Sequence, residues 1–327
     1  MTQPSLSRFS RTIIKYLRGY SSDRSAVFVN QYETYLKATT IVRIFYLGVF
    51  FFTTNAFMLL WEEWSRLTTL PQPLWPVAWI NNAPFLPAIN LIGIGGVIFT
   101  LLATIFPTSR LNRAMSAITF FLIMAIIHSF GKINHSYHVW IVAGFLLIFL
   151  PSNNKTGSIS HRHQYLTVIM GTQLLTLSFY TSSGIWKIYG FLVQAWGGQI
   201  HAFHPLALSQ QIAYRLLQTN SPSIAGPFFI EHPYLGWPLY SGAVFLELFA
   251  IFVAFRPNLH RFWGISLLFF HLGIWLTMSI TFHTHMLFIL IFLVLSPFHP
   301  TYLTVKDVLY SLPILGDALT YFSKQRQ

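Results

Sequence analysis

Long apolar blocks separated by short polar segments recur along most of the chain. We expect about eight of these blocks to cross a membrane as helices, over residues 41–61, 88–106, 114–130, 138–150, 165–183, 237–255, 263–281 and 284–299. A helix rises about 1.5 Å per residue, so about 20 apolar residues cross the ~30 Å hydrocarbon core of a bilayer. The fourth block is short for a full span, and we expect it to extend outward or to begin inside the membrane. The pattern predicts an all-α integral membrane protein, a bundle of about eight transmembrane helices.

The composition supports a lipid environment. Apolar residues make up 54% of the 327 residues and charged residues only 9%. A soluble domain carries about 25% charged residues because its surface must face water. The lipid bilayer is therefore the first partner that we expect. The chain has no cysteine, which excludes disulfides, thiolate nucleophiles and cysteine-ligated metals.

The positive charges predict an orientation. If the N-terminus is cytoplasmic, the outer segments hold only Arg66, Lys132, Lys187 and Arg215 of the 20 lysines and arginines, and Arg43 lies within the first span. Lysine and arginine concentrate in the cytoplasmic loops of membrane proteins, so we expect both termini in the cytoplasm. This distribution accounts for the net charge of +12, and we expect no nucleic-acid partner.

Three segments are expected along the chain. Residues 1–40 place basic residues between apolar ones at helical spacing, which predicts a basic amphipathic segment on the inner leaflet. Residues 41–300 form the transmembrane domain. Residues 301–327 form a cytoplasmic C-terminal tail, in which residues 305–323 show a weaker amphipathic pattern.

Ionisable residues inside a span are costly and mark candidate functional sites. Glu247 and His271 lie near the middle of the sixth and seventh spans; we expect Glu247 to be paired or protonated, and His271 to be functional or bonded to a neighbouring helix. Arg43 can extend its side chain to the inner interface. Lys187 follows Trp186 at the outer end of the fifth span. It is either an interface anchor or a base, because a lysine partly removed from water loses its proton more readily.

Histidine pairs raise the alternative of a metal centre. The pairs His135/His138 and His201/His204 both lie on the outer side, where the longest segments between spans are found. Histidines at this spacing can ligate a metal, but neither pair has a carboxylate nearby. We therefore expect no metal, rank a His-ligated metal oxidase last among the hypotheses, and place the site on the extracytoplasmic side.

The order of several short motifs resembles a known family. Asn134–Tyr137, with the sequence Asn-His-Ser-Tyr, precedes an apolar span; Tyr180 and the Gly-Ile-Trp-Lys segment Gly184–Lys187 follow, and then Glu247 and His271. Over roughly residues 30–300 this order resembles the membrane domain of vitamin K-dependent γ-glutamyl carboxylase and its bacterial relatives, the horizontally transferred transmembrane (HTTM) family.

The resemblance implies a quinol site with catalytic residues. Lys187 matches the lysine that deprotonates a vitamin K-like quinol, and His135 matches a residue that binds or polarises the quinol oxygen. Contacts to the quinol are implied for Asn134, Tyr137, Tyr180, Trp186 and His271. The family's site faces the lumen, which corresponds to the outer side here. If Lys187 and His135 share one site, the outer ends of the fourth and fifth spans are neighbours.

The substrate implied by the resemblance is a secreted peptide or a lipid. The carboxylase has an aspartate in place of Glu247, a lysine in place of Trp186, and a lumenal β-rich region that we do not expect here. We therefore expect quinol-linked modification of a secreted peptide or lipid rather than carboxylation of a peptide. The alternative is a non-enzymatic membrane protein that assembles or carries a secreted factor.

Overall fold

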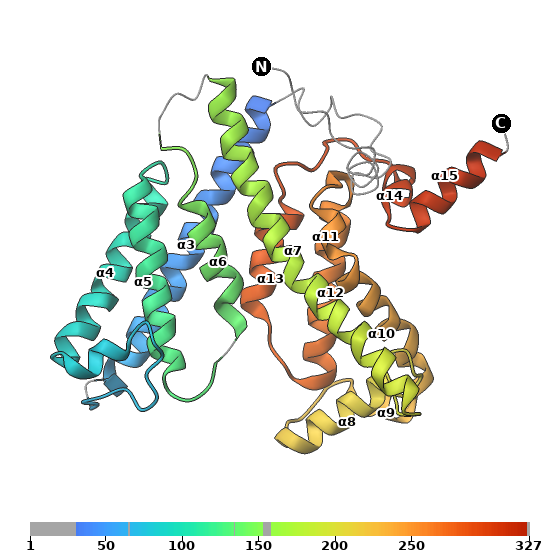
Figure 1. The fold of residues 1–327 in the computed structure, drawn as a ribbon, viewed down its shortest axis with the longest axis horizontal. Helices are drawn as coiled ribbons and strands as arrows, with labels where there is room; N and C mark the ends of the chain where they lie inside the picture. Colours follow the sequence, from blue (N-terminus) through green and yellow to red (C-terminus); the bar gives the residue numbers. More distant parts are fainter. Residues whose placement is uncertain (1–30, 65, 134, 153–157, 326–327) are drawn as a thin grey trace. The chain divides into compact units, whose positions relative to one another are not determined.

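A computed structural model describes residues 31–64, 66–133, 135–152 and 158–325, and these residues form helices and no strand. The predicted all-α class is therefore confirmed for the described residues. The amphipathic segment expected within residues 1–40 lies outside them up to residue 30, and Gln31 begins the first described helix. The α-helices are α3 Gln31–Trp64, α4 Phe85–Ile105, α5 Arg110–His128, α6 His138–Leu147, α7 Ile159–Trp196, α8 Ala207–Thr219, α9 Gly226–Glu231, α10 Pro233–Leu248, α11 Ala250–Val253, α12 His260–Met278, α13 His283–Ile289, α14 Val305–Ser311 and α15 Leu315–Gln325. Figure 1 shows these helices as ribbons, coloured in the order of the sequence.

The chain folds as two compact units. The described residues of Gln31–Thr172 form one, here called the N-terminal unit, and those from Gln173 to the end form the other, the C-terminal unit. Helix α7 contributes its first part to the N-terminal unit and its second part to the C-terminal unit. The candidate site described below lies entirely in the C-terminal unit.

Four helices are long and apolar enough to cross a membrane, among the residues that the structure describes. They are Tyr32–Leu59, Phe85–Ile105, Arg110–His128 and Pro257–Met278. The expectation of helices with the length and composition of membrane spans is confirmed for these four. The other predicted blocks also fall on helices, but α6, α10 and α13 are shorter. Helix α7 is 38 residues long and carries polar residues along its length, which lowers its hydropathy.

Small residues let the helices of the N-terminal unit pack closely. A Cβ atom on Gly93 of α4 would lie 2.1 Å from the Phe57 ring of α3, and one on Gly96 would lie 2.7 Å from Ile123 of α5. Helices in lipid associate through such close van der Waals contacts, because apolar burial drives their association little there. Glycine at these positions brings α3, α4 and α5 together.

The buried Arg113 joins loops of the same unit. Its guanidinium donates to the carbonyl oxygen of Pro107 at 2.6 Å, to that of Ile148 at 3.3 Å, and to that of Leu150. Ile148 and Leu150 follow the end of α6 at Leu147, and their carbonyl groups accept from Arg113. A buried cation at this end also suits the negative end of the helix dipole.

A π-helical turn, Leu290–Val294, follows α13 in the C-terminal unit and is held by a polar chain. Gln173 Nε2 donates to the carbonyl oxygen of Phe292 at 2.6 Å and to Ser296 Oγ at 3.1 Å. Ser296 Oγ pairs with His260 Nδ1 at 2.6 Å, and His260 Nε2 pairs with the Val253 carbonyl at 2.9 Å. Because a carbonyl only accepts, His260 is protonated on Nε2 and Ser296 donates to Nδ1. The chain of donors fixes α7 against α12 and the π-turn.

Candidate functional site

Lys187 of α7 and Glu247 of α10 form an ion pair in the C-terminal unit. The two helices meet at Gly184, where a Cβ atom would lie 2.5 Å from the backbone nitrogen of Leu248 and 2.6 Å from its Cα atom. Any side chain at this position would collide with backbone, which cannot move aside. Gly184 therefore permits the close approach that brings Lys187, one turn further along α7, to the carboxylate.

The two partners differ in exposure. The Glu247 side chain is 5% exposed and that of Lys187 is 25% exposed. Glu247 Oε2 accepts from Lys187 Nζ, and its Oε1 accepts from Ser183 Oγ at 3.2 Å. A buried carboxylate is costly unless it is paired and hydrogen-bonded, and here both oxygens have a donor. Of the two outcomes expected for Glu247, the structure has the paired one.

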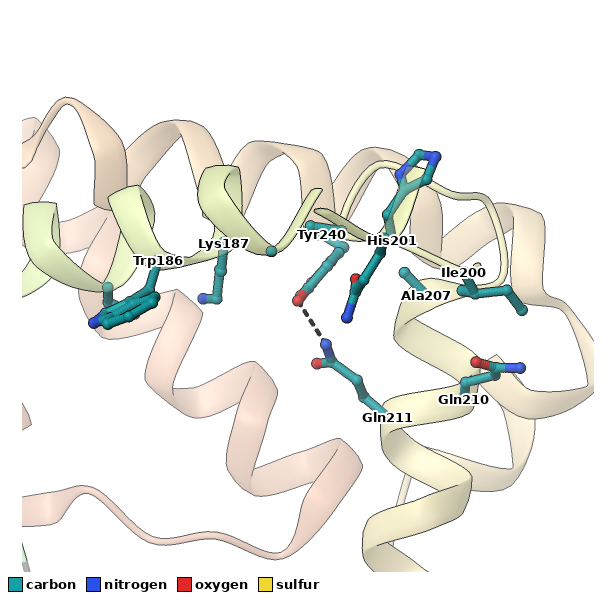
Figure 2. A pocket seen from close by; sticks show the side chains of 12 residues that line it. Trp186, Lys187, Ile200, His201, Ala207, Gln210, Gln211 and Tyr240 are labelled. Atoms are coloured by element: carbon teal, nitrogen blue, oxygen red, sulfur yellow. Dashed lines mark hydrogen bonds between the residues drawn. The ribbon is translucent and has the colours of Figure 1, made fainter. Parts of the chain in front are cut away.

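Lys187 also borders a cavity of about 500 Å³. The residues that line it come from α7, α8, α10 and the segment before α8: Ser183, Trp186, Lys187, Gly190, Gln194, Ile200, His201, Ala202, Ala207, Gln210, Gln211 and Tyr240. Figure 2 shows the Lys187 side chain and the Tyr240 hydroxyl pointing to the same side, with Gln211 reaching toward Tyr240 from α8. The cavity thus has a polar wall beside the ion pair.

The polar wall is rich in hydrogen-bond donors. Gln211 Nε2 donates to Tyr240 Oη at 2.7 Å, which leaves the Tyr240 proton able to donate elsewhere. Lys187 Nζ lies 5.8 Å from the centre of the Tyr240 ring and 5.9 Å from that of Phe270. Ammonium and hydroxyl donors at one wall favour a ligand that presents oxygen atoms. The Trp186 and Tyr240 rings offer faces for an aromatic group.

Tyr180 and His271 form a second buried pair in this unit. Tyr180 Oη and His271 Nε2 are 2.9 Å apart, and Nδ1 of His271 has no hydrogen-bond partner among the described residues. The His271 ring lies 4.9 Å from that of Phe282 and 6.1 Å from that of His285, measured between centroids. Neither Tyr180 nor His271 lines the cavity, whereas Trp186 does. The hydrogen bond joins α7 to α12, and the quinol contacts implied for both residues stay predictions.

Other predicted site residues lie in the N-terminal unit. The Nδ1 atoms of His135 and His138 are 3.2 Å apart, and the Tyr137 ring packs edge-on to Phe52 at 5.4 Å. Arg43 is exposed on α3, and Asn134 lies outside the described residues. The expected approach of His135 to Lys187 stays a prediction.

Histidine clusters were the basis for the metal alternative. Across the described residues, no group of three or more His, Cys, Asp or Glu side chains is arranged to hold a metal ion. His201 and His204 have ring centroids 5.9 Å apart, and His201 lines the cavity.

The cavity also contains polar residues that the sequence did not single out. Ser183 lies four residues before Lys187 on α7, and helical spacing places it on the same face. Gln210 and Gln211 on α8 and Tyr240 on α10 carry no such local signal, because only the fold brings these helices to Lys187.

No family model, no curated protein and no solved structure matches this chain.

Proposed function

We propose that the protein is a membrane enzyme that binds a lipid-soluble quinol in the cavity and takes a proton from its hydroxyl group at the Lys187–Glu247 pair. The observation that carries the proposal is the asymmetry of this pair. Its carboxylate is almost fully buried, while its ammonium borders a cavity of about 500 Å³. Cavities that bind small molecules measure about 300–1,000 Å³, so a quinone head group fits.

The ion pair supports a proton transfer in which Lys187 both gives up and receives a proton. Lys187 Nζ already donates to Glu247 Oε2, so it must pass a proton on before it can take one from a ligand. Lys187 Nζ can pass one proton to Glu247 Oε2 and receive one from the ligand hydroxyl. Glu247 then holds the proton in neutral form, and the Lys187 ammonium faces the negative charge that develops on the ligand oxygen. The number of charges stays constant, which limits the cost of the step in a low-dielectric site.

The remaining wall residues would orient the ligand. Tyr240, polarised by Gln211, donates toward a ligand oxygen, and Trp186 covers an aromatic ring. A bound quinol supplies an acidic hydroxyl group and a ring that can be oxidised. The modified substrate would be a secreted peptide or a lipid, as the resemblance to the carboxylase and HTTM family implies.

We also propose how the chain crosses the membrane. Besides the four long apolar helices, the remaining predicted blocks on α6, α7, α10–α11 and α13 would cross, with both termini in the cytoplasm and the cavity on the extracytoplasmic side. The distribution of lysine and arginine supports this orientation. Because the chain has no cysteine, single cysteines can test it. A membrane-impermeant maleimide should label Gln218→Cys in intact cells, and should label Thr301→Cys only after permeabilisation. The reverse pattern would contradict the orientation.

The function is tested by extracting lipids from the purified protein and measuring quinones by mass spectrometry. The wild type should retain a quinone, Lys187→Ala should lose it, and Tyr240→Phe should retain less. Lys132→Ala removes an exposed lysine of the N-terminal unit and should behave as the wild type. Quinone absent from every sample would sink the proposal and favour the non-enzymatic role in assembling or carrying a secreted factor.

A further inference from the structure

Helix α15 carries an apolar stripe that its own unit leaves uncovered. Leu315, Leu319 and Phe322 are 53%, 40% and 62% exposed, and Ala318 between them is exposed too. Their spacing of i, i+3, i+4 and i+7 places them on one face of the helix. Asp317 is exposed on the opposite face. Such a stripe is stable only where something apolar covers it.

The preceding helix is tied to the start of a candidate span. Arg256 Nη1 donates to the carbonyl oxygen of Ser311 at 2.8 Å, and Asn258 Nδ2 donates to Ser311 Oγ at 3.2 Å. Ser311 is the last residue of α14, and the span Pro257–Met278 begins beside Arg256. Arg256 and Ser311 are both buried, so this connection is part of the fold. It holds the end of α14 next to the first residues of this candidate span.

The turn between α14 and α15 has a defined shape. Ile314 has a φ of 64°, a left-handed conformation that a β-branched residue rarely adopts. A Cβ atom on Gly316 would lie 2.1 Å from the carbonyl oxygen of Tyr310, so this position requires glycine. The direction of α15 is therefore set by the turn. Figure 1 shows α15 running outward beside α14, away from the helices that precede it in the unit.

We infer that α15 lies along the membrane surface where α12 begins, with the stripe of Leu315, Ala318, Leu319 and Phe322 in the lipid. The anchoring at Ser311 favours lipid over a soluble partner, because it fixes the helix next to the end of a membrane span. An interfacial helix buries its apolar face among the acyl chains and keeps its polar face in water. Lys306, exposed on α14, adds a cation that suits anionic headgroups. This inference does not depend on the quinol proposal.

The test uses the full chain, in which a single introduced cysteine is the only one. Leu319→Cys, Phe322→Cys and the control Asp317→Cys are each spin-labelled in vesicles of phosphatidylglycerol and phosphatidylcholine. Accessibility is then measured toward oxygen, which partitions into lipid, and toward a water-soluble nickel complex. Oxygen should dominate at 319 and 322, and nickel at 317.

Two results would overturn the inference. Nickel dominating at all three positions would place the stripe in water. Low accessibility to both reagents at 319 and 322, with spin–spin broadening between labels, would show that a second copy of the chain covers the stripe.

Discussion

The structure predicts a large loss of stability when the Lys187 ammonium is removed and Glu247 is kept. Lys187→Met keeps most of the side-chain volume and deletes the ammonium. Glu247, 5% exposed, would then keep only Ser183 as a hydrogen-bond donor among the contacts described. Removing one member of a buried ion pair costs about 3–5 kcal/mol, because the remaining charge is buried without compensation. Lys187 is itself 25% exposed, and some water would reach the carboxylate. We therefore expect the lower end, about 3 kcal/mol.

A double-mutant cycle separates this penalty from loss of packing. Replacing both partners, as in Lys187→Met with Glu247→Leu, removes the unpaired charge, and the double variant should recover most of the lost stability. Unfolding free energies are measured in detergent for the four proteins of the cycle: the wild type, Lys187→Met, Glu247→Leu and the double variant. About 3 kcal/mol corresponds to roughly a hundredfold change in the unfolding equilibrium, which is easily measured. A stable Lys187→Met variant, or a double variant no better than it, would refute the account of a buried pair.

Three further predictions concern the surroundings of the site. Gly184→Ala should separate α7 from α10, lower the thermal stability and reduce the retained quinone, whereas Gly242→Ala on α10, with open space at its Cβ position and outside the cavity lining, should change neither. Gln173→Leu should lower the unfolding free energy by about 1–3 kcal/mol, because it removes the Nε2 donor to the Phe292 carbonyl and the Ser296 hydroxyl. Thr304 donates from its hydroxyl and backbone N–H to Asp307, which lowers the pKa of that carboxyl group below its ordinary value. Since the folded state favours the charged form, this contribution is present above the ordinary pKa and is lost as the pH falls through the lowered one. The protection of the α14 amides, measured as the exchange rate relative to the intrinsic rate at the same pH, should therefore fall at acidic pH, and should change less in Thr304→Ala.

The helices were largely predictable, and their ends were not. Each predicted apolar block falls on helix, because apolar length is a strong signal. The block 165–183 ends where the apolar residues end, but α7 continues to Trp196. Backbone hydrogen bonds propagate a helix through polar residues as readily as through apolar ones. Lys187 is consequently inside a continuous helix rather than at the end of one.

The sequence predicted the charged residues of the candidate site, but not that these two residues pair with each other. An acidic residue in an apolar span requires a partner, and the sequence singled out both Glu247 and Lys187. That these two meet depends on Gly184, whose role appears only once α10 crosses it. Tyr240 and Gln211 lie on separate helices, and no local sequence motif marks either residue. Their convergence on one cavity is a property of the fold, which no local pattern encodes.

Removal of a proton from a bound quinol by the Lys187–Glu247 pair can be observed in the spectrum of the bound molecule. A soluble naphthoquinol analogue, added under anaerobic conditions, reports this directly, because deprotonating its hydroxyl group changes its ultraviolet absorption. We expect the spectrum of the deprotonated analogue on binding to the wild type, and the spectrum of the neutral form with Glu247→Gln. A saturated wild-type protein that shows only the neutral form would contradict the proposed proton removal.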